Sequence, residues 1–342
     1  MPGLGKVGLV VIGRNEGERL ERCLASVRSI PNLVYVDSGS TDGSVALGRA
    51  LGATIVELNI PPQFTAARAR NAGLARLLAD NTDLEFVQMV DGDCEMQPGW
   101  IDAALATLRS GNDVAVALGR LRERYPERSI YNALCNDEWD IPLGDATGCG
   151  GNAMFRVSAL RQVNFYNPKM IAGEDSELSM RLRKAGWRLQ RIDVEMGLHD
   201  AALTRFGQWW TRTRRSGHGY GEMAALHPDA RRPNWPRTVR SIMVWGGLMP
   251  AALLIALIAA VIISPYWWFA VGLLFLQWPL RMVQLAVRQR RRGLSVRVAS
   301  ASGFFLIFGK MPQLQGLLGY YRDRFLGRAS HLIEYKEGGE AT

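Results

Sequence analysis

Short apolar runs alternate with longer amphipathic segments through the first 120 residues of the chain. The runs VGLVVI from Val7 and LVYVD from Leu33 have the length of buried strands, and each precedes a segment whose apolar residues recur at helical spacing. This alternation predicts an α/β domain with a mostly parallel, Rossmann-like sheet. We expect strands at 7–12, 33–37, 54–58, 86–91 and 114–119, and helices at 18–28, 44–51, 66–79 and 100–110.

A different pattern begins after residue 240, because no charged residue occurs between Arg240 and Arg281. A single helix through this stretch would run about 60 Å, twice the thickness of the hydrocarbon core of a bilayer. Ser264 and Pro265 stand at its middle, where proline favours a turn. We predict a hairpin of two transmembrane helices, at about 242–263 and 266–287; a buried hairpin of a soluble protein is the alternative.

Basic residues flank this hairpin on both sides. They are Arg231, Arg232, Arg237 and Arg240 before it, and Arg288, Arg290, Arg291 and Arg292 after it. The positive-inside rule then places both ends in the cytoplasm. The chain carries 41 Lys and Arg against 32 Asp and Glu, a net charge of +9, and most of the excess lies in the C-terminal third. Charge beside a membrane segment favours anionic lipid as its partner, so we expect no nucleic-acid partner.

The segment 299–321 is apolar at 304–308 but is interrupted by Lys310, Pro312 and two glutamines. We predict interfacial or re-entrant helices here. A third span is the alternative, and it would place the basic residues from Arg322 onward outside, against the charge rule. The expected organisation is a catalytic domain at 1–230 and a membrane domain at 231–342 that ends in a cytoplasmic tail. The first apolar run is too short for a signal peptide, so we expect the catalytic domain in the cytoplasm.

Four cysteines, Cys23, Cys94, Cys135 and Cys149, form no CxxC pair. Their spacing argues against a disulfide framework and against a structural zinc site, and it favours a reducing compartment.

Polar clusters follow the predicted strands, where ligands of an open α/β sheet bind. Asn15 and Glu16 follow the first strand, and Asp37 opens a polar loop after the second. Asp91 and Asp93 follow a later strand, and Gly92 between them permits a tight turn. Such a carboxylate pair suits a hard divalent ion that also holds phosphate oxygens, although the same residues also form ordinary turns.

From about Val7 to Tyr220 the ordered motifs resemble the family 2 glycosyltransferases, which have the GT-A fold. The motifs are VVIGRNEGERLERCLASV, VDSGSTDGS, ARARNAGL, DGD, GCGGNAMFR and GED. The resemblance implies contacts with a nucleotide-sugar donor at Asn15, Glu16, Asp37, Arg70, Asn71, Asp91, Gly92, Gly151, Asn152 and Glu174. It also implies that Asp91 and Asp93 hold Mg2+ or Mn2+, and that Asp175 is the catalytic base.

Each of these residues also has a purely structural interpretation. Glu174 and Asp175, taken alone, are typical of a helix N-terminus. His199 could contact the metal or a phosphate, or could be an ordinary packed histidine. Arg212 and Arg215 could bind the donor diphosphate or anionic lipid, and the neighbouring Trp209 and Trp210 could stack on a sugar or anchor the interface.

The Gln-x-x-Arg-Trp signature of processive synthases is absent, because Thr213 follows Arg212. The function that the resemblance implies is transfer of one sugar from a UDP-linked donor to a polyprenyl-linked saccharide in bacterial polysaccharide biosynthesis. We expect a multi-pass protein of the bacterial inner membrane with membrane lipid as a partner; the tail HLIEYK resembles exopolysaccharide transferases. The alternatives are a nucleotidyltransferase, whose glycine-rich basic loop is missing after the first strand, and an inactive membrane-bound carbohydrate-binding scaffold.

Overall fold

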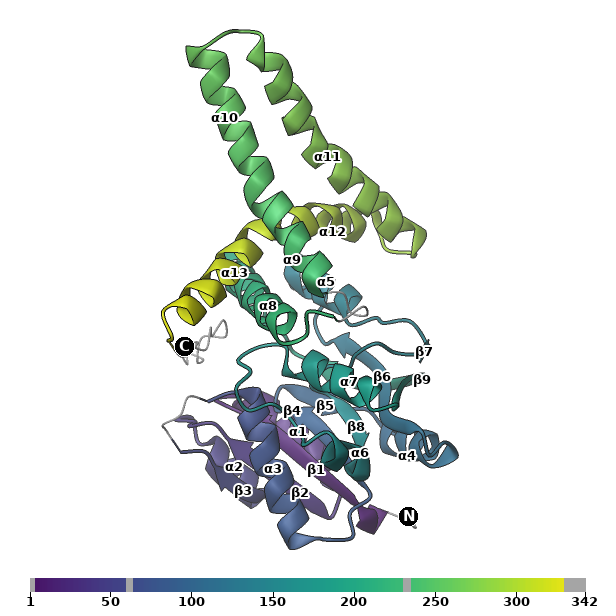
Figure 1. The fold of residues 1–342 in the computed structure, drawn as a ribbon. Coiled ribbons are helices and arrows are strands. Elements are labelled where there is room, and N and C mark those ends of the chain that lie inside the picture. The colour runs from purple at the N-terminus through teal and green to yellow at the C-terminus, as the bar shows by residue number, and fades with distance from the viewer. Residues whose placement is uncertain (1–3, 60–63, 230–234, 329–342) are drawn as a thin grey trace. The chain divides into compact units, whose positions relative to one another are not determined.

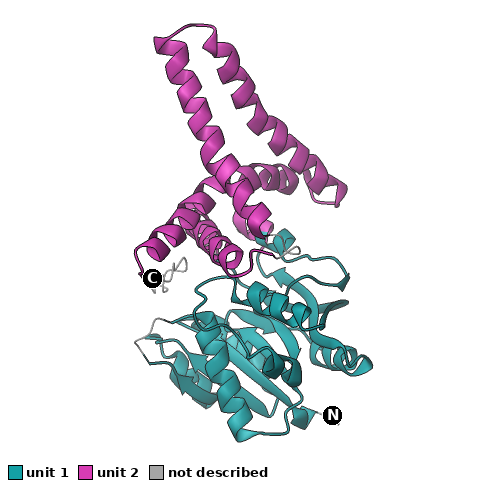
Figure 2. Ribbon diagram, viewed as in Figure 1, with its two compact units in different colours: residues 1–125, 135–202, 336–342 teal, residues 126–134, 203–335 magenta. Residues whose placement is uncertain are grey.

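The computed structural model describes residues 4–59, 64–229 and 235–328, and the statements below concern these residues. They form two compact parts (Figure 2). The sheet domain comprises 4–125 and 135–202, and the helical region comprises 126–134 and 203–328. The predicted domain boundary at 230 and 231 lies outside the described residues, as do Arg231, Arg232 and the tail HLIEYK, so these stay predictions.

The sheet domain contains a nine-stranded sheet in the order β3-β2-β1-β4-β8-β6-β9-β5, with β7 paired to β9. Its strands are β1 (Val7–Gly13), β2 (Asn32–Asp37), β3 (Thr54–Glu57), β4 (Phe86–Asp91), β5 (Cys94–Met96), β6 (Val114–Glu123), β7 (Gly144–Asp145), β8 (Ala153–Arg156) and β9 (Arg188–His199). The four strands from β3 to β4 are parallel, as predicted. In the other half, β8 is antiparallel to both β4 and β6. The α/β class is confirmed, with a mixed sheet.

Helices cover both faces of this sheet (Figure 1). The helices on one face are α1 (Glu18–Val27), α2 (Ser44–Ala50) and α4 (Trp100–Ser110), and those on the other are α3 (Ala66–Asp80), α6 (Val157–Gln162) and α7 (Glu174–Lys184). The alternation along β1 explains both layers, because Leu9 and Val11 enter one core whereas Val10 and Ile12 enter the other. A one-residue slip would exchange these faces, so burial fixes the register.

The register brings the candidate polar residues to one edge. In the parallel pairs, Gly13 lies opposite Asp37 and Ile12 lies opposite Asp91, so β1, β2 and β4 end side by side. Their following loops therefore emerge together at the carboxyl edge of the sheet, where an open α/β sheet binds its ligands. The short helices η1 (Leu4–Lys6) and α5 (Ile130–Glu138) complete the elements before residue 203.

The helical region contains the predicted apolar hairpin. Helix α9 (Trp235–Met243), the π-helical turn η2 (Val244–Leu248) and α10 (Met249–Ile262) form one stretch, and α11 (Trp267–Arg291) forms the second. Both are long and apolar enough to cross a membrane. The break falls at Ser264 and Pro265, as predicted, and Ile262 and Phe269 near it are each 75% exposed. Apolar side chains this exposed at the tip of two helices fit a lipid environment.

The remaining helices are α8 (Phe206–Leu226), α12 (Val296–Phe308) and α13 (Lys310–Phe325). The backbones of α8 and α13 approach closely, because a side chain added at Gly316 would place its Cβ 1.9 Å from the carbonyl oxygen of Arg214. Gly217 stands equally close to Gln313. The break at Gly309 divides the segment predicted as interfacial into two helices. Whether it lies in the interface or spans the membrane stays a prediction.

Candidate active site

Asn15 joins the loop after β1 to the loop after β2. Its backbone N–H donates to Ser40 Oγ at 2.9 Å, and its side-chain Oδ1 accepts from the Thr41 N–H at 2.7 Å. Asn15 has a left-handed backbone conformation, with φ of 53°, which asparagine tolerates better than most residues. The neighbouring Glu16 pairs with Arg19 Nη2 at 2.9 Å. These contacts order the loop that we predicted to meet the nucleotide.

Asp37 organises its own loop from a buried position, 2% exposed. Its Oδ2 accepts from the N–H groups of Gly39 and Ser40, at 2.9 and 2.8 Å, and its Oδ1 accepts from the Tyr35 hydroxyl at 2.9 Å. Burial, reinforced by the charge of Asp37, raises the pKa of Tyr35 well above its ordinary value, so this hydroxyl stays a donor. The carboxylate of Asp37 already accepts three hydrogen bonds, so its predicted contact with the nucleotide-sugar donor would have to share them.

Arg70 is the centre of a cluster of opposite charges that we call the arginine cluster: Arg70, Asp91, Glu174 and Asp175. Its guanidinium contacts Asp91 Oδ1 and Glu174 Oε1 at 2.8 Å each, and Asp175 Oδ1 at 3.3 Å. Its side chain is only 3% exposed. Burial alone would lower the pKa of Arg70, but Asp175 and Asp91 raise it well above its usual range. The cation is therefore fixed, and it joins α3, β4 and α7.

Two further predicted residues complete the surroundings of Asp91. Asn152 accepts from the Asp91 N–H at 3.0 Å through Oδ1, and its amide lies 3.3 Å from Asp91 Oδ2. Gly151 packs directly on the ion pair, since a Cβ there would lie 2.1 Å from Arg70 Nη2 and 2.7 Å from Asp91 Oδ2. A larger residue at position 151 would push the pair apart. The structure places both residues beside Asp91, and their predicted contact with the donor stays a prediction.

The acids of α7 occupy the first turn of that helix. Gly173 precedes them with φ of 80°, a conformation that favours glycine, and lets the chain enter the helix sharply. The positive end of the helix dipole favours ionised carboxylates at Glu174 and Asp175. The Asp175 side chain is 17% exposed and Glu174 only 9%, so Asp175 is the more accessible of the two.

Asn71, the neighbour of Arg70, serves the backbone. Its Nδ2 donates to the Tyr166 carbonyl at 2.8 Å, and its Oδ1 accepts from the Tyr166 N–H at 3.1 Å. The Tyr166 ring in turn lies 5.5 Å from the Arg70 guanidinium carbon. Both polar atoms of the Asn71 amide are hydrogen-bonded to the Tyr166 backbone, so Asn71 fixes the position of Tyr166 beside the arginine cluster. Its predicted contact with the nucleotide-sugar donor stays a prediction.

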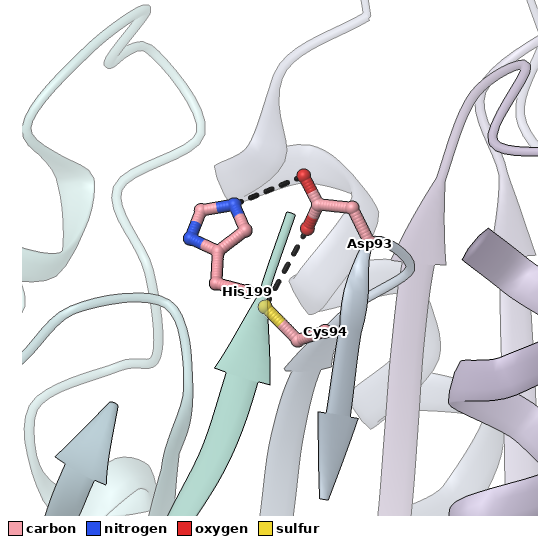
Figure 3. Close-up of side chains that lie close together, drawn as sticks. All are labelled: Asp93, Cys94 and His199. Carbon is pink, nitrogen blue, oxygen red and sulfur yellow. Dashed lines mark hydrogen bonds and ion pairs between the residues drawn. The ribbon is translucent and has the colours of Figure 1, made fainter. Parts of the chain in front are cut away.

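A second cluster, the metal corner, consists of Asp93, Cys94 and His199 (Figure 3). Asp93 Oδ2 lies 3.0 Å from His199 Nε2, and Cys94 Sγ lies 3.5 Å from Asp93 Oδ1. One ligand atom from each residue falls within a span of 4.8 Å. Asp93 and Cys94 are buried and His199 is partly buried. Carboxylate and imidazole ligands at this spacing fit a divalent ion such as Mn2+.

The metal corner brings together two of the three predicted metal ligands. Asp93 and His199 belong to it, whereas the Asp91 carboxylate contacts Arg70 and Asn152 instead. Gly92 between the two acids donates its N–H to the Ile12 carbonyl at 2.8 Å, and the turn there directs the acids to different neighbours. Asp91 as a metal ligand stays a prediction.

Three residues that sequence reasoning missed surround His199. Trp139 stacks on its ring, with centroids 4.4 Å apart and planes 20° apart. Glu123 is buried and accepts from the Ala201 and Tyr125 N–H groups at 3.0 and 3.1 Å, which fixes the chain after His199. Burial raises the pKa of Glu123. Cys94 lies opposite His199 in the β5–β9 pair. The signal for these residues is the fold itself, since none of the three lies near His199 in sequence.

The remaining predicted residues, Arg212 and Arg215, lie on α8 in the helical region. Trp209 and Trp210 on the same helix belong to an aromatic cluster. Its members are Tyr131, Phe206, Trp209, Trp210, Phe304, Phe305 and Phe308. Trp209 is buried in this cluster, so packing explains it without a sugar ligand.

Comparison with known families extends the resemblance drawn from the motifs. Residues 9–164 match the sequence profile of glycosyl transferase family 2, and residues 141–281 match that of glycosyl transferase family group 2. The first match covers β1 to α6 and includes both acids of the Asp-Gly-Asp motif. The second covers Glu174, Asp175 and the first apolar helix.

Among curated proteins, the chain is 28% identical over 269 residues to a pre-mycofactocin glycosyltransferase of Mycobacterium tuberculosis, covering 75% of this chain and 54% of that protein. It is 27% identical over 191 residues to a TPR repeat-containing protein of Synechococcus elongatus, covering 54% of this chain and 40% of that protein. The chain thus spans about half the length, or less, of the curated relatives it matches.

Among solved structures, a mannosyltransferase of Pyrobaculum calidifontis in complex with GDP-Man and Mn2+ matches with a TM-score of 0.59. The match covers 93% of this chain and 88% of that one, at 16% identity. Likeness at this identity concerns the fold, and it confirms the GT-A architecture of the sheet.

Proposed function

We propose that the chain is an inverting, metal-dependent transferase of single sugars, because residues 9–164 match the profile of glycosyl transferase family 2 and the sheet domain has the GT-A fold. Its donor is a nucleotide-diphosphate sugar, and its acceptor is a lipid-linked saccharide. One observation carries this proposal: Asp175 contacts Arg70, Arg70 contacts Asp91, and Asp93 stands two residues further on with His199. The proposed base, Asp175, is thus connected through Arg70 and Asp91 to the residues that would hold the metal.

Asp175 is the proposed base. Inversion requires a carboxylate that takes the proton of the acceptor hydroxyl while the oxygen attacks the sugar carbon. The guanidinium of Arg70, 3.3 Å from Asp175 Oδ1, favours the ionised carboxylate that this step needs. The proton then rests on Asp175 until it passes to water. Glu174 is more buried and binds Arg70 more closely, which suits it to holding the cation in place.

Asp93 and His199 are the proposed metal ligands. A divalent ion there would neutralise the charge that develops on the departing nucleoside diphosphate. Asp93 is oriented by His199, and the His199 ring is held by Trp139. Asp91 is 29% exposed despite its contact with Arg70, so one face of its carboxylate is available to the donor or to the metal. Asn15, Glu16 and Asp37 would order the loops around the nucleotide.

We further propose that the two apolar helices anchor the enzyme in the bacterial inner membrane with the sheet domain in the cytoplasm. Arg237 and Arg240 lie in the first two turns of the first span, and Arg288 and Arg290 to Arg292 lie at the end of the second or directly after it. This distribution obeys the positive-inside rule for a hairpin with both ends inside. A membrane-fixed active site favours an acceptor that is itself in the membrane, such as a polyprenyl-linked saccharide in polysaccharide assembly. In that setting Arg212 and Arg215 would meet donor phosphates or anionic lipid.

The second candidate is a membrane-bound scaffold that retains the fold without turnover. It would have no need for a buried cation among three acids, which is costly unless every charge is paired. The contacts of Arg70 and the pairing of Asp93 with His199 therefore favour the enzyme.

The test is release of nucleoside diphosphate by the detergent-purified full chain from a panel of UDP-, GDP- and dTDP-sugars. Each reaction contains Mn2+, Mg2+ or chelator, with lipid extract as acceptor and pre-mycofactocin as a second acceptor class. We expect metal-dependent release from one donor, reduced at least about 100-fold in Asp175→Asn. Asp80→Asn is the matched control, because Asp80 is exposed and pairs with exposed Arg76 on α3. Absence of release from every donor would favour the scaffold.

A further inference from the structure

The register of one strand pair places a thiol beside the proposed metal ligands. Strands β5 and β9 are antiparallel, and Cys94 lies directly opposite His199. Residues opposite each other in such a pair extend to the same face, with Cβ atoms about 5 Å apart. Asp93 stands in the turn before β5, so strand alternation does not direct it to the other face. Three side chains therefore converge from a turn and two strands (Figure 3).

The distances suit shared coordination. Within the Asp93 carboxylate, Oδ2 lies 3.0 Å from His199 Nε2, and Oδ1 lies 3.5 Å from Cys94 Sγ. All three ligand atoms fall within 4.8 Å of one another. Ligands of a tetrahedral zinc ion sit about 2.0–2.3 Å from the metal, so neighbouring ligand atoms in such a site are separated by comparable distances of about 3–4 Å. Small adjustments of the side chains would accommodate an ion.

The remaining cysteines have other surroundings. Cys149 Sγ lies 3.2 Å from Ser179 Oγ, and Cys23 Sγ lies 3.7 Å from the Asp91 carbonyl. Among the residues that the structure describes, Cys94 is the cysteine that shares a potential metal site with a carboxylate and an imidazole. This combination changes the expected preference of the corner, because thiolate and imidazole suit Zn2+ and Co2+, whereas Mg2+ prefers oxygen ligands in an octahedron.

We propose that the Cys94 thiolate is a third protein ligand of the metal corner, which then binds Zn2+ or Co2+ in preference to Mg2+. Three protein ligands leave a fourth position open, as in catalytic zinc sites, for water or a donor oxygen. As the sulfur–metal bond forms, the thiol proton passes to water. Zn2+ at this corner would compete with Mn2+, because sites made of N, O and S ligands generally bind Zn2+ more tightly than Mn2+. The inference rests on the proposed function only in placing the transferase metal at the same corner.

The experiment uses the full chain in detergent, without donor, so that it reports metal binding and not turnover. Co2+ is titrated first, because a cobalt–thiolate bond produces a charge-transfer absorption in the near ultraviolet that oxygen and nitrogen ligands do not give. We expect this band to saturate at one Co2+ per chain and to be displaced by Zn2+ but not by equal Mg2+. Absence of the band in the wild-type protein, at Co2+ concentrations that bind, overturns the proposal without any variant.

Cys94→Ser then tests the assignment, with Cys135→Ser as the matched control, because Cys135 is also buried but lies outside the metal corner. We expect Cys94→Ser to lose the band and to bind Zn2+ at least about 100-fold more weakly, the upper end of what losing an outer ligand partner costs. Cys135→Ser should keep both. If Cys94→Ser binds Zn2+ like wild type while Asp93→Asn does not, the thiol is no ligand, and the proposed function stands without it.

Discussion

The two acids of the Asp-Gly-Asp motif lie two residues apart and have opposite surroundings. Asp91 contacts a buried arginine and an asparagine amide, within a cluster that holds two more acids. Asp93 contacts an imidazole and a thiol. The first surroundings neutralise a carboxylate permanently. The second bring together three side chains that could hold a metal ion.

This contrast assigns different tasks to similar residues. A buried carboxylate is costly unless it is paired or coordinates a metal, and the carboxylate of Asp91 is paired with Arg70. The arginine cluster thus suits fixed electrostatics around the proposed base, and the metal corner suits an exchangeable ion. Gly92 makes the division possible, because the turn between the acids separates their directions.

The largest effect is expected from removing the cation of the arginine cluster. Arg70→Met leaves three carboxylates near one another without compensation, and breaking a buried ion pair from one side costs about 3–5 kcal/mol. We expect the free energy of unfolding of the sheet domain to fall by that amount, measured by denaturant titration of tryptophan fluorescence in detergent.

The control on the same helix is Arg76→Met, because Arg76 is 48% exposed and pairs with exposed Asp80 at i,i+4. An exposed pair of this kind contributes about 0.3–0.5 kcal/mol. Equal destabilisation by the two substitutions would show that Arg70 does not compensate the acids, and the contrast between the two clusters would fail.

A smaller effect is expected at the metal corner from Trp139→Leu. His199 Nε2 contacts Asp93, whereas Nδ1 has no hydrogen-bond partner among the described residues, so the stacked Trp139 ring is the second contact that orients the imidazole. Loss of an orienting partner weakens metal binding about 10-fold. Calorimetric titration with Mn2+ checks this, and unchanged affinity in a folded Trp139→Leu protein would show that the stacking is only packing.

Sequence patterns predicted the first half of the fold well, because its elements are local. The alternation of β1 and the amphipathic spacing of α1 and α3 are visible in single segments, and their parallel winding follows from simple rules of connection. The short strands β5, β7 and β8 were not predicted. Two to four residues carry too little periodicity, and these strands form because neighbours are already in place.

The site was predicted in part for the same reason. The order of the motifs identified Asp91, Asp93, Asp175 and His199 as candidates. It could not show that Arg70 forms ion pairs with three acids. The spacing of the cysteines gives no sign of Cys94 as a ligand, because His199 lies 105 positions later and is brought opposite Cys94 by strand register. Ligand sets that assemble across strands leave no spacing signature in the sequence.

The most direct test of this account compares Mn2+ affinity in Asp93→Asn and Asp91→Asn, measured by calorimetry on the folded full chain without donor. We expect Asp93→Asn to weaken Mn2+ binding by at least about 100-fold, because it removes a direct ligand, and Asp91→Asn to weaken it by less than about 10-fold. Equal losses in the two variants, or Mn2+ binding that survives Asp93→Asn, would contradict the assignment of the metal to the corner of Asp93 and His199.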